Sequence, residues 1–298
     1  MDAMQTVIGI DAGGTEIKAG VIRGSEVIVE RRWPTGRENG PDHARDQILS
    51  AARELHAEYP EASAIGLVVP GIVDVNKKIA VFSENIRWRD VPFGDLLHEI
   101  TGLPVGFGHD VRAAGLAEAS AGTVKPSQNS LFLALGTGIA GAIIVNGELF
   151  ENPYAGEIGH LDVDSGLPCA CGGSGCLETN ATGPSIAAIY NSISGGTAQN
   201  SKDVLDAANL GDEAATKVWE TATRSIGRAL TAYITLLAPD VIILGGGLSK
   251  AGQDLLNPIN KYFDNHLTFQ QRPQLMLATL GDTAGMIGAG IIAKRSLK

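Results

Sequence analysis

The sequence predicts an α/β protein made of two duplicated domains with a cleft between them. A repeated pattern carries this prediction: an apolar strand, a glycine and threonine turn, a second apolar strand and a hairpin signal occur at 6–25 and again at 131–149. Elsewhere, short buried-strand runs alternate with segments of helical spacing. Glycine, proline, serine and asparagine concentrate at 122–129. We therefore expect one domain at 1–121 and another at 122–298, whose last helix can pack back on the first.

The first copy has strands expected at 6–11 and 16–22, joined by a glycine turn. The turn and its flanks offer free backbone amides, a hydroxyl and an ammonium group, which are groups that bind a polyphosphate tail. The segment is not a Walker A motif, because the GxxxxGK[ST] order is absent. A tight hairpin without a ligand is the alternative interpretation. The candidate phosphate-binding residues are Asp11, Gly13, Gly14, Thr15 and Lys18.

The rest of the first half alternates amphipathic helices with buried strands, as an α/β domain requires. The expected elements are a helix at 42–59, a strand at 64–69 that Pro70-Gly71 ends, a helix at about 92–101, a strand at 105–107 and a helix at 111–121.

Asp110 stands between the last two of these elements. An aspartate at that place is an N-cap in the simplest interpretation, and such a cap stabilises a helix by about 1 kcal/mol. The functional interpretation is a general base that takes a proton from an attacking hydroxyl. The local sequence leaves both open.

In the second half, the strands at 131–135 and 139–145 flank a second turn, Gly136-Thr137-Gly138. Two hairpins that both expose amides favour phosphate binding over a plain turn. The segments 184–192 and 201–237 have helical spacing, the latter broken near 209–211. A strand at 240–244 then runs into three glycines, which indicate close backbone approach to a flat ligand such as adenine and ribose, or only a glycine-rich strand-to-helix turn. These glycines are Gly245, Gly246 and Gly247.

All three cysteines, Cys169, Cys171 and Cys176, fall within eight residues, and His160 precedes the first by nine. Three thiolates and one imidazole complete a tetrahedral zinc shell, and the glycines among them let the sulfurs converge. Because four protein ligands close the shell, we expect a structural zinc that holds a loop. Three buried or free thiols are the alternative. A disulfide is disfavoured, since the count is odd and Cys169 and Cys171 are too close in sequence to bridge easily.

Two carboxylates, Glu157 and Glu178, flank the cysteine segment. They are candidates to accept hydrogen bonds from sugar hydroxyls, and the alternative is two solvated surface side chains. His160 has two ring nitrogens, so one can bind zinc while the other donates to a ligand or to a neighbouring acceptor. The metal and the neighbouring pocket are thereby expected to be coupled.

The composition limits the partners. A chain that is 44% hydrophobic and 19% charged buries a large core. Its 33 acidic and 23 basic residues give a formal charge of −10, which opposes binding of a nucleic-acid backbone, and no basic patch overrides it. The sequence shows neither an 18-residue apolar segment nor a signal peptide. We expect no nucleic acid, no membrane and, with reduced thiols suited to a metal, a cytoplasmic protein.

Together these residues resemble the ROK (repressor, open-reading-frame and kinase) family of sugar kinases, and the resemblance covers nearly the whole chain. It implies two domains of the actin-like (ribonuclease H-like) ATPase fold. Family members carry both phosphate hairpins, an E-x-G-H motif (here 157–160) and a C-x-C-G-x-x-G-C-x-E motif (here 169–178), and all stand intact in this sequence. The cysteine block is the most specific part.

The resemblance also implies an activity. It is the transfer of the γ-phosphoryl group of ATP, with Mg²⁺, to the 6-hydroxyl of a hexose or N-acylhexosamine, glucose and N-acetylmannosamine being the leading candidates. Asp110 takes the place of the catalytic base. A homo-oligomer, dimer or tetramer, is likewise implied. The implied sugar contacts are Gly71, Asn85, His109, Asp110, Glu157, His160 and Glu178.

One segment departs from the family pattern, since the family's Asn-Asp-Ala-Asn is His109-Asp110-Val111-Arg112 here. The family's asparagine usually binds a sugar hydroxyl, so the sugar stays open. Arg112 is expected to cover the pocket or reach a phosphate, or else to pair with Glu118 or another surface acid. Two alternatives to a kinase remain: a sugar-sensing regulator of the same family, disfavoured by the hairpin strand beginning at residue 6, and a catalytically weakened sugar-binding protein. Donors such as polyphosphate also stay open.

Overall fold

The computed structural model describes residues 5–120 and 129–297. The described chain forms two compact units. The first comprises 5–120, 151–154 and 282–297, and the second comprises 129–150 and 155–281. The segments 151–154 and 282–297 thus belong to the first unit although they follow the start of the second in the sequence. No helix in the described part of the chain has both the length and the hydropathy of a membrane span.

The first unit is built on a five-stranded sheet in the order β3-β2-β1-β4-β8. Strands β1, β2 and β3 are antiparallel neighbours, whereas β1, β4 and β8 are parallel. Apolar runs with β-branched residues form these strands, as the burial of nearly every residue in β1 and β4 requires. The strands are β1 (Thr6–Ala12), β2 (Glu16–Arg23), β3 (Glu26–Pro34), β4 (Ile65–Val69) and β8 (Val105–His109).

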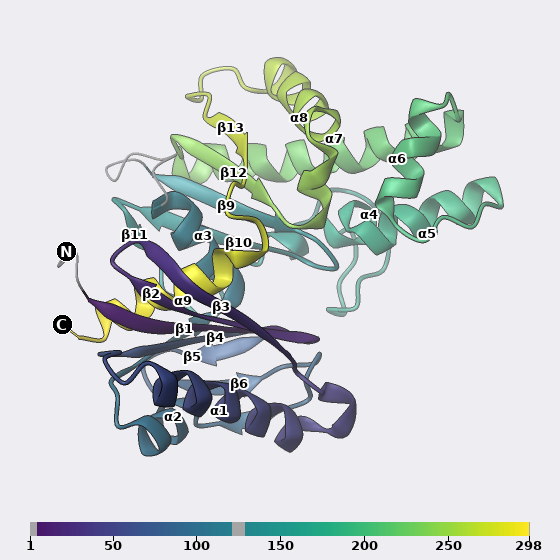
Figure 1. Ribbon diagram of the computed structural model, residues 1–298. Helices are drawn as coiled ribbons and strands as arrows, with labels where there is room; N and C mark the ends of the chain where they lie inside the picture. The colour runs from purple at the N-terminus through teal and green to yellow at the C-terminus, as the bar shows by residue number, and fades with distance from the viewer. Residues whose placement is uncertain (1–4, 121–128, 298) are drawn as a thin grey trace. The chain divides into compact units, whose positions relative to one another are not determined.

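Helices cover both faces of this sheet. Ile48 and Leu55, on the apolar stripe of α1 (Pro41–Glu58), share one core cluster with Ile10 and Leu67 of the strands. The same cluster takes in residues of α2 (Phe93–Thr101). The other face carries α3 (Asp110–Ser120) and α9 (Ala284–Arg295), and Figure 1 shows α9 in yellow against the purple strands.

A row of glycines lets α9 lie directly on the strands. Gly9, Gly66 and Gly106 are aligned across β1, β4 and β8. A Cβ on Gly66 would lie 1.9 Å from the carbonyl oxygen of Ala289, and one on Gly106 would lie 2.6 Å from that of Ile292. Any side chain in this row would therefore push the helix off the sheet.

A small antiparallel sheet completes the first unit. It consists of β5 (Ile72–Asp74), β6 (Ile79–Phe82) and β7 (Arg89–Val91), in that order. The sequence pattern does not predict this sheet, because each strand is only three or four residues long. Its β6–β7 connection carries Asn85.

The second unit repeats the topology of the first, with the sheet order β11-β10-β9-β12-β13. Here too three strands are antiparallel neighbours and the last two continue the sheet in parallel. The predicted duplication is therefore confirmed. The strands are β9 (Ser130–Leu135), β10 (Ile139–Val145), β11 (Glu148–Leu149), β12 (Val241–Gly245) and β13 (Gln274–Leu277).

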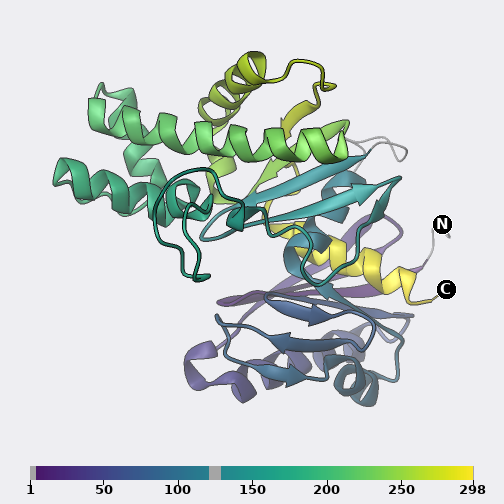
Figure 2. The same ribbon diagram turned by 180° about the vertical axis from the view of Figure 1, so that it is seen from behind.

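The helices of the second unit pack their apolar stripes on its sheet. Ile226 and Leu230 of the long helix α7 share a core with Leu133 and Leu244, and Figure 2 shows α7 along one face of the strands. The predicted break near 209–211 separates α6 from α7, and the Asp212 carboxylate caps α7 by accepting from the Ala215 N–H at 3.0 Å. The helices are α4 (Glu178–Ala181), α5 (Gly183–Ser194), α6 (Ser201–Asn209), α7 (Glu213–Leu237) and α8 (Gln253–His266).

Candidate functional site

The predicted site residues form two sets, one on each unit. In the first unit they gather at the carboxyl ends of the parallel strands. Asp11 pairs with Val68 across β1 and β4, and Val69 pairs with His109 across β4 and β8, so the residues that end these strands are neighbours. Ligands of open α/β sheets bind at this edge.

Asp110 begins α3, and its side chain is 26% exposed. Oδ1 accepts a hydrogen bond from the adjacent Val111 N–H at 2.7 Å and lies 3.1 Å from Nδ1 of His109. This hydrogen bond comes from the residue that directly follows, whereas the usual N-cap bond comes from the second or third helical residue. A partly exposed carboxylate at a sheet edge can accept a proton from a bound hydroxyl.

His109 is more enclosed than its neighbour, with a side chain that is 11% exposed. Its buried Nδ1 has no hydrogen-bond partner in the described chain, although Asp110 is close, because the angles do not suit a hydrogen bond. A buried ring nitrogen without a partner can take a polar group of a ligand.

Asp11 is the most perturbed carboxyl group of this edge. Burial, followed by the negative charge of Asp110, raises its pKa to about 7; Asp282 adds to the shift and Lys18 opposes it. The Lys18 ammonium donates to the Asp282 carbonyl at 3.2 Å. Carboxylates that repel one another at a polar edge suit a divalent cation such as Mg²⁺, which would relieve the repulsion.

Hydrogen bonds hold the carbonyl groups of the first glycine hairpin and leave two of its N–H groups without an acceptor among the described residues. The Gly13 N–H donates to the Glu16 carbonyl at 3.0 Å and closes the turn. Thr35, fully buried directly after β3, donates twice: its N–H to the Thr15 carbonyl at 2.9 Å and its hydroxyl to the Gly13 carbonyl at 2.7 Å. The N–H groups of Gly14 and Thr15 have no acceptor among the described residues, so they are available to an anion.

Thr35 is a support of this hairpin that the sequence pattern does not predict. Thr35 stands 22 residues from Gly13, and a lone threonine after a strand carries no signal of that contact. Only the pairing of β2 with β3 brings the two together.

Gly71 and Asn85 lie on touching segments. Gly71 has a φ of +99°, and a Cβ there would lie 2.2 Å from the Phe82 carbonyl oxygen. Asn85 is exposed in the loop that follows Phe82, and the Arg37 guanidinium donates to the Asn85 carbonyl at 3.4 Å. The loop that carries Asn85, a predicted sugar contact, is therefore held near the end of β3 that lies beside the glycine hairpin.

Arg112 is buried, with 4% of its surface exposed. It donates to the Pro153 carbonyl at 2.7 Å and therefore anchors the segment 151–154 on α3. Its predicted pairing with Glu118 or another surface acid stays a prediction.

In the second unit, the Gly136-Thr137-Gly138 turn is closed by a hydrogen bond from the Gly136 N–H to the Gly138 carbonyl at 3.0 Å. Thr137 and Gly138 are exposed. The carboxylate of Glu178 lies against this turn, and its Oε1 accepts from the Ile139 N–H at 2.5 Å. Glu157 is exposed and precedes the single turn Ile158–His160.

The predicted metal ligands come together. The ligand atoms of His160, Cys169, Cys171 and Cys176 all lie within 4.8 Å of one another. Nδ1 of His160 is 3.7 Å from Sγ of Cys169, and the other two sulfurs are 3.7 Å apart. Adjacent ligands of a tetrahedral zinc with bonds of ~2.3 Å are about 3.8 Å apart, so the donor set fits the ion.

The loop that holds these ligands turns on glycines. Gly172 and Gly175 have φ values of +91° and +82°, and a Cβ on Gly175 would meet the Asp162 carboxylate at 2.3 Å. Burial raises the pKa of the Cys176 thiol to about 12. A buried thiol among other thiols ionises readily only beside a cation, which is consistent with a metal at this place.

The three glycines after β12 serve different purposes. Gly245 is buried, and a Cβ there would lie 2.7 Å from the Phe132 ring, whereas one on Gly246 would lie 2.4 Å from the Leu135 carbonyl oxygen. Close packing of β12 on β9 accounts for both. Gly247 has open space beside it, as the approach of a ligand requires.

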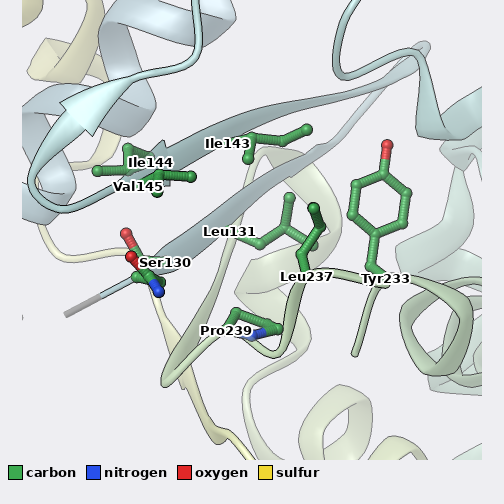
Figure 3. A pocket seen from close by; sticks show the side chains of 9 residues that line it. Ser130, Leu131, Ile143, Ile144, Val145, Tyr233, Leu237 and Pro239 are labelled. Carbon is green, nitrogen blue, oxygen red and sulfur yellow. The ribbon is translucent and has the colours of Figure 1, made fainter. Parts of the chain in front are cut away.

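A pocket at the other end of β9 and β10 does not suit a substrate. It has room for about one water molecule, near 10 Å³, between the mostly apolar side chains shown in Figure 3, among which Ser130 and Tyr233 carry hydroxyls. Its lining residues are Asn129, Ser130, Leu131, Ile143, Ile144, Val145, Tyr233, Leu237 and Pro239.

Comparisons with known proteins agree with these features. The model of the ROK family matches residues 7–296. A glucokinase of Halalkalibacterium halodurans is 34% identical over 97% of this chain and 94% of its own length. The crystal structure of a ROK hexokinase from Thermus thermophilus has a TM-score of 0.86 at 30% identity, over 98% of this chain and 99% of that one.

A second solved structure is a ROK family glucokinase from Streptomyces griseus in complex with glucose and AMPPNP. It has a TM-score of 0.77 at 30% identity and covers 97% of this chain and 99% of its own. Since the family model spans nearly the whole sequence and relatives at 30% identity or more cover it almost completely, the chain belongs to the ROK family.

Proposed function

We propose that the protein is an ATP-dependent sugar kinase that phosphorylates the 6-hydroxyl of a hexose or N-acylhexosamine, with glucose and N-acetylmannosamine as the leading acceptors. One observation carries the proposal. A partly exposed carboxylate, Asp110, lies at the same sheet edge as Asp11 and as the Gly13–Gly14 hairpin with its free backbone N–H groups. The glucokinase relative and the AMPPNP complex of another family member support the sugar and the donor.

Asp110 is the proposed general base. It accepts the proton of the acceptor's 6-hydroxyl as that oxygen forms a bond to the γ-phosphorus, while the bond from that phosphorus to the leaving oxygen of ADP breaks. Mg²⁺, which Asp11 would help to hold beside the phosphates, would neutralise the charge that develops on the leaving oxygen. The free N–H groups of Gly14 and Thr15 bind phosphate oxygens and align them, so most of the rate enhancement is positioning and electrostatics.

The remaining predicted residues divide between the two ligands. Lys18, the Gly136-Thr137-Gly138 turn and the glycines at 245–247 are the proposed nucleotide contacts, with Gly247 the most accessible of the last three. The proposed acceptor contacts are Gly71, Asn85, His109, Glu157, His160 and Glu178.

The Cys/His segment is proposed to hold a structural zinc through His160, Cys169, Cys171 and Cys176. Zinc bound there cross-links the loop between Glu157 and Glu178 and takes no part in phosphoryl transfer, because the four protein ligands fill its shell.

The test is a coupled assay of ADP release with Mg²⁺ and ATP, against glucose, mannose, N-acetylglucosamine and N-acetylmannosamine, on zinc-replete protein. Sugar-dependent ADP release is expected with at least one of them. Protein that binds ATP and sugar but releases no ADP would be a sugar-binding protein or a regulator instead, and the first variant to make is then His109→Asn.

A further inference from the structure

The Glu178 side chain reaches across to the second glycine hairpin. Its Oε1 accepts a hydrogen bond from the Ile139 N–H at 2.5 Å, directly after the turn. A Cβ on Gly138 would lie 3.0 Å from the same oxygen, and one on Gly159 would lie 2.8 Å from it. The carboxylate is therefore enclosed between the hairpin and the E-x-G-H turn, and both glycines leave room for it.

The backbone beyond Glu178 holds the same hairpin a second time. The Gly183 N–H, at the start of α5, donates to the Gly136 carbonyl at 3.1 Å. The intervening corner is itself fixed, since the Ser185 hydroxyl donates to the Glu178 carbonyl at 2.7 Å. The two ends of the hairpin are thus bonded to one corner of the chain, the segment 178–183.

This corner continues directly from the cysteine segment. Cys176 is two residues before Glu178, and the Leu177 N–H donates to the Leu161 carbonyl at 2.9 Å. The residues that bring the Cys/His ligands together therefore also fix the backbone of Glu178, whose side chain bonds to Ile139.

We propose that Glu178 is a positioning residue for the Gly136–Gly138 hairpin, in addition to any contact it makes with the acceptor. A hydrogen bond that a backbone N–H donates to a carboxylate is about twice as strong as one to a neutral acceptor, so it fixes the turn in the shape that meets the phosphates. Oε2 makes no hydrogen bond within the described residues and stays available for a sugar hydroxyl. The inference rests on the proposed function, since it assumes that the hairpin binds nucleotide.

Equilibrium binding of a non-hydrolysable ATP analogue, without sugar, tests the inference on zinc-replete full-length protein. In Glu178→Gln the amide oxygen still accepts from Ile139 but carries no charge, so the dissociation constant should rise only about threefold. Glu178→Ala removes the acceptor and Glu178→Asp shortens it, and each should weaken binding about tenfold, the usual effect of losing a charged hydrogen bond. Glu220→Ala, an exposed carboxylate on α7, is the matched control.

Acceptor kinetics separate the two roles of the side chain. The KM for sugar should rise in all three Glu178 variants, whereas the KM for ATP should rise clearly more in Ala and Asp than in Gln. If both bind the analogue as tightly as the parent does, the inference is wrong and the kinase proposal stands. If the parent chain binds no nucleotide, the proposed function itself fails. Zinc content and thermal midpoint identify a variant that has not folded, and Glu178→Asp, which keeps the charge, then carries the test.

Discussion

The carboxylate of Asp11 lies directly against Gly285 near the start of α9, so closely that a Cβ on Gly285 would be 2.2 Å from Oδ2 of Asp11. A residue at the end of the first strand and one near the end of the chain therefore depend on each other. The helix N-terminus favours a negative charge at this place, which partly offsets the burial of Asp11.

Gly285→Ala should consequently displace Asp11. If Asp11 helps to hold Mg²⁺ with the phosphates, turnover should fall about tenfold or more, and the Mg²⁺ concentration for half-maximal rate should rise, while the KM for sugar changes little. Initial rates over a Mg²⁺ series measure both. Gly290→Ala is the control, because the added Cβ meets only the movable end of Ile22. An equal change of Mg²⁺ dependence in both variants would contradict the role of Asp11.

Asp110→Asn keeps the shape of the side chain and removes its basicity. Turnover should fall on the order of 10² to 10⁴, the range for loss of a general base, with sugar affinity nearly unchanged. Steady-state kinetics together with direct sugar binding measure the two effects. Unchanged turnover would remove Asp110 as the base.

Asp11 also makes stability depend on pH. Its pKa is raised from 3.8 to about 7 in the folded chain, so the unfolded chain loses this proton first as the pH rises. The free energy of unfolding should then decrease between about pH 4 and 7 and change little above that on account of this group. Thermal midpoints in Mg²⁺-free buffer from pH 5 to 8 should show the decrease, and Asp11→Asn should reduce it. Asp46→Asn, an exposed carboxylate of the same unit, should keep the parent's profile.

Cys171→Ser tests the metal segment with a side chain of similar size. Bound zinc should be lost, the thermal midpoint should drop and sugar binding should weaken, because the loop between Glu157 and Glu178 loses its cross-link. Metal analysis of the purified variant and sugar titration are the measurements. Ser174→Ala, in the same loop, should change none of them, and a Cys171→Ser chain without metal but with full sugar affinity would refute the coupling.

Features within a short stretch of chain could be predicted from the sequence. Both hairpins and the Cys/His cluster fall in this class, since the spacing of glycines, threonines and cysteines over fewer than twenty residues fixes their geometry. The duplication was predictable because each copy repeats the same order of strands and turns.

Contacts between distant segments could not be predicted in this way. The bonds of Thr35 to Gly13 and of Glu178 to Ile139 join residues 22 and 39 positions apart, and only strand pairing and helix packing bring them together. Arg112 shows the same limit, because its bond to the Pro153 carbonyl joins residues 41 positions apart.

The row formed by Gly9, Gly66 and Gly106 also bears on how the chain is made. A ribosome delivers residues from the N-terminus onward, so these strands emerge long before α9, which covers them, has been translated. Until then only α3 covers that face, and the row of glycines lacks the helix that packs on it. The first unit is thus completed only when α9 has been translated, and during synthesis the uncovered glycine row is apolar sheet surface that is prone to aggregation.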